Sequence, residues 1–304
     1  MINCSKLHLL FLLFYSPLLI AKNIVTLPMD EVDWLYKGNN LKCELKYITE
    51  REGKFYFRSE QKQHAYLNIE LVSSDKELTD RELYGYPAPW QDDVPPLLIS
   101  TVSSQTGKQV IFAQNISDLL LYIERGGWVG YSVGGNTASA SHTYLVPTVR
   151  IHQPLRDFVN CQKSLPLMSY SQAKDISLQF NIGQKSLSSE QLTTLAALNS
   201  YLQADPSVSK ILVDGHTDSS GARASNLALS RVRAELVSKQ LHHLGVSQSM
   251  IEVRAHGSRY PIATNTTTAG QAKNRRVTLR LVRSNETVIP VSTNENNNVA
   301  KVQS

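Results

Sequence analysis

The feature that most constrains the fold of this 304-residue chain is an apolar run that stops at Asp-Gly and is followed by a long helical repeat. Ile211, Leu212 and Val213 precede Asp214-Gly215, which is the pattern of a buried strand before a turn. After a polar loop, apolar residues recur at helical spacing at Leu229, Val232, Leu236 and Leu244, with Val237 and Leu241 widening the row. The sequence therefore predicts a strand, a loop and an amphipathic helix that packs against a sheet.

The flanking segments predict further elements of the same domain. Ile176, Leu178 and Phe180 alternate with polar residues, as along a half-buried strand. Ser188 and Gln191 fit a capping box. The helix behind this box carries the apolar positions Leu192, Leu195, Leu198 (or Asn199) and Leu202, and strands are expected at 251–255 and 277–282. The order β-α-β-α-β over residues 175–283 predicts a two-layer sandwich of helices on a sheet, in a chain of the α+β class.

Polar residues around the predicted strand end suggest a binding site. Thr217, Asp218 and Asn226 are expected in the loop beyond the strand, and Arg233 near the beginning of the helix. A carboxylate can face an ammonium group while a guanidinium forks onto a carboxylate, so the pair could bind one small zwitterion. Taken singly, such residues are more often structural: the Asp bonds its own turn, and the Arg is a solvated charge. As an ordered set they favour ligand binding.

Three segments carry a family resemblance. Residues 211–221, 226–234 and 273–277 together resemble the peptidoglycan-binding signature of OmpA-like domains. The resemblance implies an OmpA-like fold whose ligand is the diaminopimelate of a peptidoglycan stem peptide. It also implies that Asp218 takes the amino group and Arg233 the carboxylate of that ligand. Supporting hydrogen bonds are then expected from Thr217, Asn226 and Arg275.

Both ends of the chain bear on location. Lys6 precedes an apolar run from Leu7 to Ile20 that contains Pro17, and Ala21 offers a small residue for cleavage. Residues 1–21 are therefore predicted to be a secretory signal peptide, cleaved near Ala21, and the mature protein is expected in the periplasm. Residues 284–304 hold little that could pack and are predicted to be a disordered tail.

The cysteines predict a cross-link. Signal removal would discard Cys4, and no cysteine closely follows the apolar run to accept a lipid. Cys43 and Cys161 remain, and an even pair in an oxidising compartment predicts a disulfide, with two buried thiols as the alternative. Since no Cys-x-x-Cys or Cys/His cluster is present, no metal or cofactor is expected.

The first domain, residues 22–165, is predicted to be a β-rich barrel or sandwich with little helix. Residues 43–48 and 65–72 alternate apolar and polar side chains, as half-buried antiparallel strands do. Gly- and Pro-containing turns separate the runs. One short helix is expected at 118–123, capped by the segment Asn115–Ser117.

A second resemblance covers this first domain. Residues 41–45, the Pro87–Trp90 turn and Cys161 just before the OmpA-like region are similar to the MotY family of flagellar proteins. That resemblance implies a periplasmic T-ring component of a sodium-driven polar flagellar motor. Its first domain would dock on the basal body with a MotX-like protein. Its second domain would hold peptidoglycan and help to recruit the stator through the stator B subunit.

Other classes of protein are open to test. An OmpA-family outer-membrane protein that links the envelope to peptidoglycan is the main alternative. The net charge of +5 is moderate and spread out, which does not suggest nucleic-acid binding. A wall enzyme would need catalytic residues, and none is predicted. The histidines His216, His242, His243 and His256 are interpreted as solvated or core residues, and the Gly-x-Ser-x-Gly match at 130–134 as a turn between strands.

Overall fold

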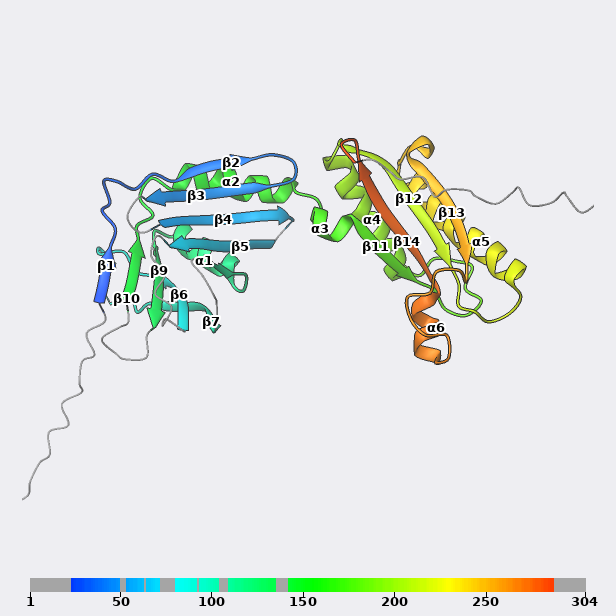
Figure 1. Ribbon diagram of the computed structural model, residues 1–304. Coiled ribbons are helices and arrows are strands. Elements are labelled where there is room, and N and C mark those ends of the chain that lie inside the picture. The colour runs from blue at the N-terminus through cyan, green and yellow to red at the C-terminus, as the bar shows by residue number, and fades with distance from the viewer. Residues whose placement is uncertain are drawn as a thin grey trace, which may run out of the picture. The chain divides into compact units, whose positions relative to one another are not determined.

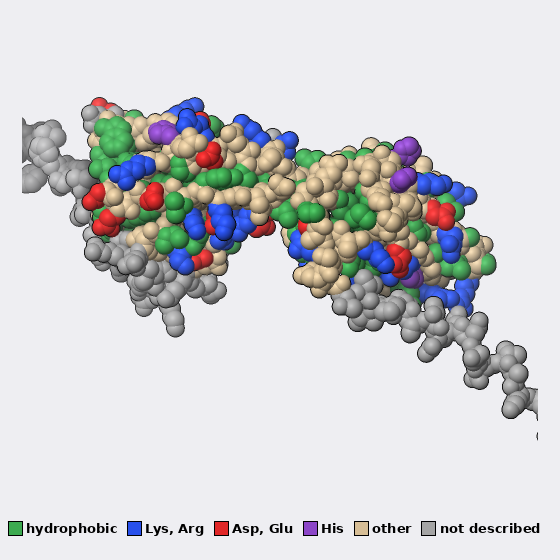
Figure 2. Space-filling view, turned by 90° about the horizontal axis from the view of Figure 1, so that it is seen from above, with side chains coloured by type: hydrophobic (Ala, Val, Ile, Leu, Met, Phe, Trp, Pro, Cys, Tyr) green, Lys and Arg blue, Asp and Glu red, His purple; other side chains and the backbone are tan. Residues whose placement is uncertain are grey.

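The computed structural model describes residues 23–49, 53–62, 64–71, 80–91, 93–103, 109–134 and 142–286. The predicted signal peptide lies outside these residues, as does the predicted tail from residue 287 onward. On the face drawn in Figure 2, basic, acidic and apolar side chains are intermixed over the described surface. No described helix has the length and apolar character that a membrane crossing requires.

The N-terminal region contains two five-stranded sheets (Figure 1). One has the order β1-β10-β9-β6-β7, made of β1 (Asn23–Thr26), β6 (Asp80–Tyr86), β7 (Leu97–Ser103), β9 (Trp128–Gly134) and β10 (His142–Val146). The other has the order β2-β3-β4-β5-β8, made of β2 (Leu35–Gly38), β3 (Cys43–Thr49), β4 (Gly53–Gln61), β5 (His64–Leu71) and β8 (Gln109–Phe112). The predicted β-rich domain is confirmed, and its described strands form two sheets rather than one closed one.

Aromatic side chains fill the core of this region. The ring centroids of Phe112 on β8 and Tyr131 on β9 are 6.1 Å apart. The two sheets therefore contribute side chains to a shared core. Tyr131 is fully buried, and its hydroxyl accepts a hydrogen bond of 2.8 Å from Arg81. The match at 130–134 lies inside strand β9, so its interpretation as a turn was wrong. Ser132 there shares a 2.8 Å hydrogen bond with Thr143 of the neighbouring strand.

Two longer helices accompany the sheets, where little helix was expected. The first, α1 (Ile116–Glu124), was predicted, but Asn115 does not cap it with its side chain. Asn115 has φ 58°, and its side-chain Nδ2 donates a hydrogen bond of 3.0 Å to the carbonyl of Ile99. The second, α2 (His152–Ser164), was missed. Pro154 looks like a helix breaker in sequence, but in the first turn proline costs no internal hydrogen bond.

The predicted disulfide is confirmed. It joins Cys43 of β3 to Cys161 of α2, with a Cα–Cα distance of 6.0 Å. Gly38 leaves the space for it, because a Cβ atom at that position would lie only 2.8 Å from the Cys161 sulfur. The bond therefore ties the unpredicted helix to the second sheet.

The C-terminal domain is the predicted sandwich with additions. Its elements are α3 (Tyr170–Ala173), β11 (Asp175–Gln179), α4 (Ser189–Ala204), β12 (Val208–His216), α5 (Arg223–His243), η2 (Gln248–Met250), β13 (Ile251–Gly257), α6 (Thr268–Asn274) and β14 (Arg276–Arg283). The sheet order is β11-β14-β12-β13, in which β12 pairs parallel with β13 and antiparallel with β14. Helices α4 and α5 pack on one side of this sheet (Figure 1). The capping box of α4 is present, with Ser188 and Gln191 bonded as expected.

The buried faces of both helices differ from the predicted stripes. In α5, Val232 is 40% exposed and Leu229 and Leu236 are half-buried. Val237 and Leu241 of the predicted stripe are buried, and the other buried residues of α5 are Asn226, Ser230, Arg233, Ala234 and Ser238. In α4, Leu192 is 38% exposed and Tyr201 is buried in its place. The reason is close packing: a Cβ atom at Gly215 would overlap the carbonyl oxygen of Ser230, so the small residues of α5 face the sheet.

Candidate functional site

The end of strand β12 positions the predicted binding residues. The strand continues through Asp214 and Gly215 to His216, beyond the predicted turn. The amide of Thr217 then donates to the carbonyl of Gly257 on β13 at 2.9 Å, which fixes the start of the loop. Asp218 lies in this loop, as predicted. Asn226 does not, because α5 already begins at Arg223.

All five predicted residues border one cavity of about 170 Å³. Its walls are formed by Ile182, Gly183, Thr217, Asp218, Ser220, Asn226, Leu229, Arg233, Gln271 and Arg275. They come from the β11–α4 turn, the loop after β12, the first half of α5, and the end of α6 with its junction to β14. Arg233 is in the middle of α5 and not near its beginning as predicted, because the helix already starts at Arg223. The five predicted residues are thus brought together from three separate segments, and the β11–α4 turn adds Ile182 and Gly183, which were not predicted.

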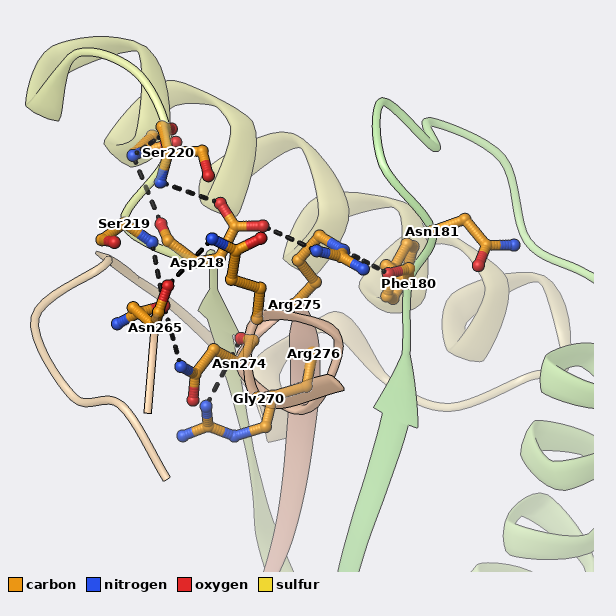
Figure 3. Close-up of polar contacts among 12 residues, drawn as sticks. Phe180, Asn181, Asp218, Ser219, Ser220, Asn265, Gly270, Asn274, Arg275 and Arg276 are labelled. Carbon is orange, nitrogen blue, oxygen red and sulfur yellow. Dashed lines mark hydrogen bonds and ion pairs between the residues drawn. The ribbon is translucent and has the colours of Figure 1, made fainter. Parts of the chain in front are cut away.

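The carboxylate of Asp218 is paired with Arg275 (Figure 3). Arg275 Nη1 lies 2.7 Å from Asp218 Oδ2, and the amide of Ser220 donates to Oδ1 at 3.0 Å. Burial raises the pKa of Asp218, but the hydrogen bonds from Arg275 and Ser220 outweigh it and lower the pKa below the usual value. Asp218 is therefore a buried anion at neutral pH, held by a residue that the sequence had placed only in a supporting role.

The guanidinium of Arg233 is fully buried and forms the other pole of the cavity. Its Nη2 donates to the carbonyl of Asn181 at 2.9 Å and its Nε to that of Gln184 at 3.2 Å. The group also lies 5.1 Å from the centre of the Phe180 ring. Burial and the nearby Arg275 lower the pKa of Arg233. Among the described atoms Nη1 has no hydrogen-bond partner, which leaves one buried donor for a ligand.

The two other predicted residues have different roles. Asn226 donates its amide to the carbonyl of Ser220 at 3.0 Å and to that of Asp218 at 3.4 Å, so it holds the loop against α5. The hydroxyl of Thr217 is buried and has no partner within the described part of the chain. Thr217 therefore offers a second unused polar group at the cavity wall.

Two asparagines that were not predicted as site residues hold the loop after β12 through hydrogen bonds (Figure 3). The Asn274 oxygen accepts from the amides of Ile262 and Ala263 at 2.8 and 3.1 Å. Its nitrogen donates to Asn265 Oδ1 at 3.0 Å, and that oxygen also accepts from the Ser219 amide at 3.1 Å. The sequence could have indicated Asn274, because it directly precedes the predicted site residue Arg275. No sequence pattern indicated Asn265.

A second polar cluster lies on strands β12 and β13. Asp214 accepts two hydrogen bonds of 2.6 Å from Arg254 and one of 2.6 Å from His256, whose ring stacks on His216 at 5.0 Å. Despite its burial, these bonds lower the pKa of Asp214 to about 2. Burial, followed by the charge of Arg276, lowers the pKa of His216 to about 4. No group of His, Cys, Asp or Glu that could hold a metal ion occurs in the described ranges.

Comparisons with known proteins match both halves of the chain. Residues 26–166 match the MotY N-terminal domain, and residues 179–275 match the OmpA family. The sodium-type flagellar protein MotY of Vibrio parahaemolyticus is 23% identical over 87% of this chain and 92% of its own length. The peptidoglycan-associated lipoprotein of Legionella pneumophila is 35% identical over 32% of this chain and 55% of that protein. A solved structure of the Burkholderia pseudomallei peptidoglycan-associated lipoprotein is 33% identical, covering 35% of this chain and 89% of that one, with a TM-score of 0.34.

The cavity therefore lies within the part of the chain that matches the OmpA family. This domain follows a β-rich region that matches the MotY N-terminal domain. The chain as a whole is MotY-like: it joins a MotY N-terminal domain to an OmpA-family domain.

Proposed function

We propose that residues 175–283 bind peptidoglycan through the diaminopimelate of its stem peptide. The observation that carries this proposal is a single cavity with a buried carboxylate, Asp218, and a buried guanidinium, Arg233, that keeps one donor unused. A zwitterionic end of diaminopimelate places an ammonium against the first and a carboxylate against the second. Thr217, Asn226 and Arg275 line the same cavity and would supply supporting hydrogen bonds to the ligand.

The pairing of Asp218 with Arg275 is compatible with this role. An ionised carboxylate accepts about four hydrogen bonds, and Asp218 uses one on Arg275 and one on Ser220. The ligand ammonium takes the remaining acceptor positions. Arg275 then neutralises charge on Asp218 when the site is empty, and adds a cation near the ligand carboxylate when the site is full.

We propose that the whole chain is a structural component of a sodium-driven polar flagellar motor. The MotY N-terminal match and the similarity to a sodium-type flagellar MotY over most of both chains support it. Residues 22–165 would dock on the basal body in the T ring with a MotX-like protein, while residues 175–283 hold the wall. The protein would work in the periplasm, after cleavage near Ala21, and help to anchor the stator through its B subunit. It acts as a clamp and not as a catalyst.

The wall-binding part is tested with purified sacculi. Asp218→Ala and Arg233→Ala should each weaken the affinity for sacculi, measured by cosedimentation, by about 2 kcal/mol or roughly thirtyfold. The reason is that each substitution leaves one charge of the ligand unpaired. Arg231→Ala is the matched control, since Arg231 lies on the same helix and is exposed. Far-ultraviolet circular dichroism confirms that each variant is folded. Wild-type binding by the Asp218→Ala/Arg233→Ala double variant would reject the assignment.

The motor part is tested in flagellated cells. Cells that lack the protein should build normal filaments yet swim poorly, since stators would not be held around the rotor. A fluorescent fusion of residues 1–165 should reach the flagellar base without restoring motility, and the exported region from Asp175 onward should bind wall without localising. Normal swimming of the deletion strain, together with uniform envelope staining, would favour the alternative of an OmpA-family envelope protein with no motor role.

A further inference from the structure

The turn between β11 and α4 presents an unusual apolar side chain. Ile182 is 79% exposed, the highest value among the large apolar side chains of the described residues. It borders the same cavity as Asp218 and Arg233. Single exposed apolar residues are common on protein surfaces, so the surroundings of Ile182 decide whether it has a role.

The turn that carries Ile182 is held rigidly. The amide of Gln184 donates to the carbonyl of Asn181 at 3.2 Å, and Gly183 has φ 67°, as the third residue of a type II turn requires. The Gln184 side chain accepts from the Asn181 amide at 2.8 Å. Arg233 clamps the carbonyls of Asn181 and Gln184 from inside the cavity. Ile182 is thus fixed at the mouth of the cavity, where a contact would cost little backbone entropy.

The chemical structure of diaminopimelate indicates which part of the ligand Ile182 would contact. The zwitterionic end of diaminopimelate continues into a chain of three methylene groups, which must leave the cavity past its rim. Apart from Ile182, the only large apolar side chain that lines the described cavity is that of Leu229, which is half-buried. We propose that Ile182 determines specificity by packing on this methylene chain, so that the site selects diaminopimelate over shorter zwitterions. The proposal rests on the peptidoglycan-binding function proposed above.

The test compares two ligands and four forms of the full-length chain by nuclear magnetic resonance titration. The ligands are meso-diaminopimelate and D-alanine, which shares the zwitterion but lacks the methylene chain. The forms are wild type, Ile182→Ser, Ile182→Leu and the control Leu192→Ser, which changes another exposed apolar residue of this domain away from the cavity. Ile182→Ser should weaken diaminopimelate binding on the order of fivefold, from the apolar area lost, and leave D-alanine binding unchanged. Ile182→Leu and Leu192→Ser should stay within about twofold of wild type for both ligands.

The outcomes separate this proposal from the function on which it rests. Wild-type affinity of Ile182→Ser for diaminopimelate overturns the role of Ile182, and Asp218→Ala then shows whether the zwitterion site itself stands. Equal weakening of both ligands also overturns it, because the substitution would then act through the turn and Arg233. If the wild-type chain binds neither ligand, both proposals fail.

Discussion

Reduction of the Cys43–Cys161 disulfide should lower the free energy of unfolding of the N-terminal region by about 4 kcal/mol. The two cysteines are 118 residues apart in the sequence, and opening so long a loop frees much conformational entropy in the unfolded chain. The double variant Cys43→Ser/Cys161→Ser should behave like the reduced wild type. In the folded state the bond joins α2 to the second sheet.

Tryptophan fluorescence during denaturant unfolding measures this effect. All three tryptophans, Trp34, Trp90 and Trp128, lie in the N-terminal region, so their emission does not report on the OmpA-family domain. An unchanged unfolding midpoint after reduction, with free thiols verified by alkylation, would contradict the prediction. A midpoint that falls for reduced wild type but not for the double serine variant would point to damage by the reductant.

The OmpA-family domain should lose about 2 to 3 kcal/mol of stability between pH 7 and pH 4.5 through His216 alone. Burial and the charge of Arg276 lower the pKa of His216 to about 4 in the folded state, against about 6.5 when unfolded. Between these values the unfolded chain binds a proton that the folded chain does not. Stability therefore falls as the pH decreases through this window, and rises as the pH increases.

Replacement of the imidazole isolates its share of the pH dependence. His216→Gln should lose less stability than wild type between the two pH values, by the amount above. Far-ultraviolet circular dichroism is the suitable signal, since the long helices α4 and α5 belong to this domain. His243→Gln is the control, because His243 is exposed at the end of α5. Equal pH dependence of wild type and His216→Gln would show that the folded protein protonates His216 without cost.

Local patterns predicted much of the fold. The order of strands and helices in the C-terminal domain followed from apolar periodicity, and the capping box at Ser188 marked the beginning of α4. Helix α2 was missed, and the proline in its first turn is compatible with a helix because it costs no internal hydrogen bond there. The buried face of α5 was predicted only in part: Val237 and Leu241 are buried, but small residues face the sheet where the backbones come closest. Apolar periodicity does not identify a buried face that includes the polar residues Asn226, Ser230 and Arg233.

The sequence by itself determined the disulfide pair, since only two cysteines remain after the predicted signal peptide, and it identified five of the residues that line the cavity. The tertiary structure decided how those residues are paired. Strand β14 lies beside β12, far from it in sequence, and this adjacency brings Arg275 to Asp218 while Arg233 turns to the carbonyls of Asn181 and Gln184. Spacing along a chain sets which side chains share an element. Which charges meet across elements depends on non-local strand order, and no local pattern encodes that order.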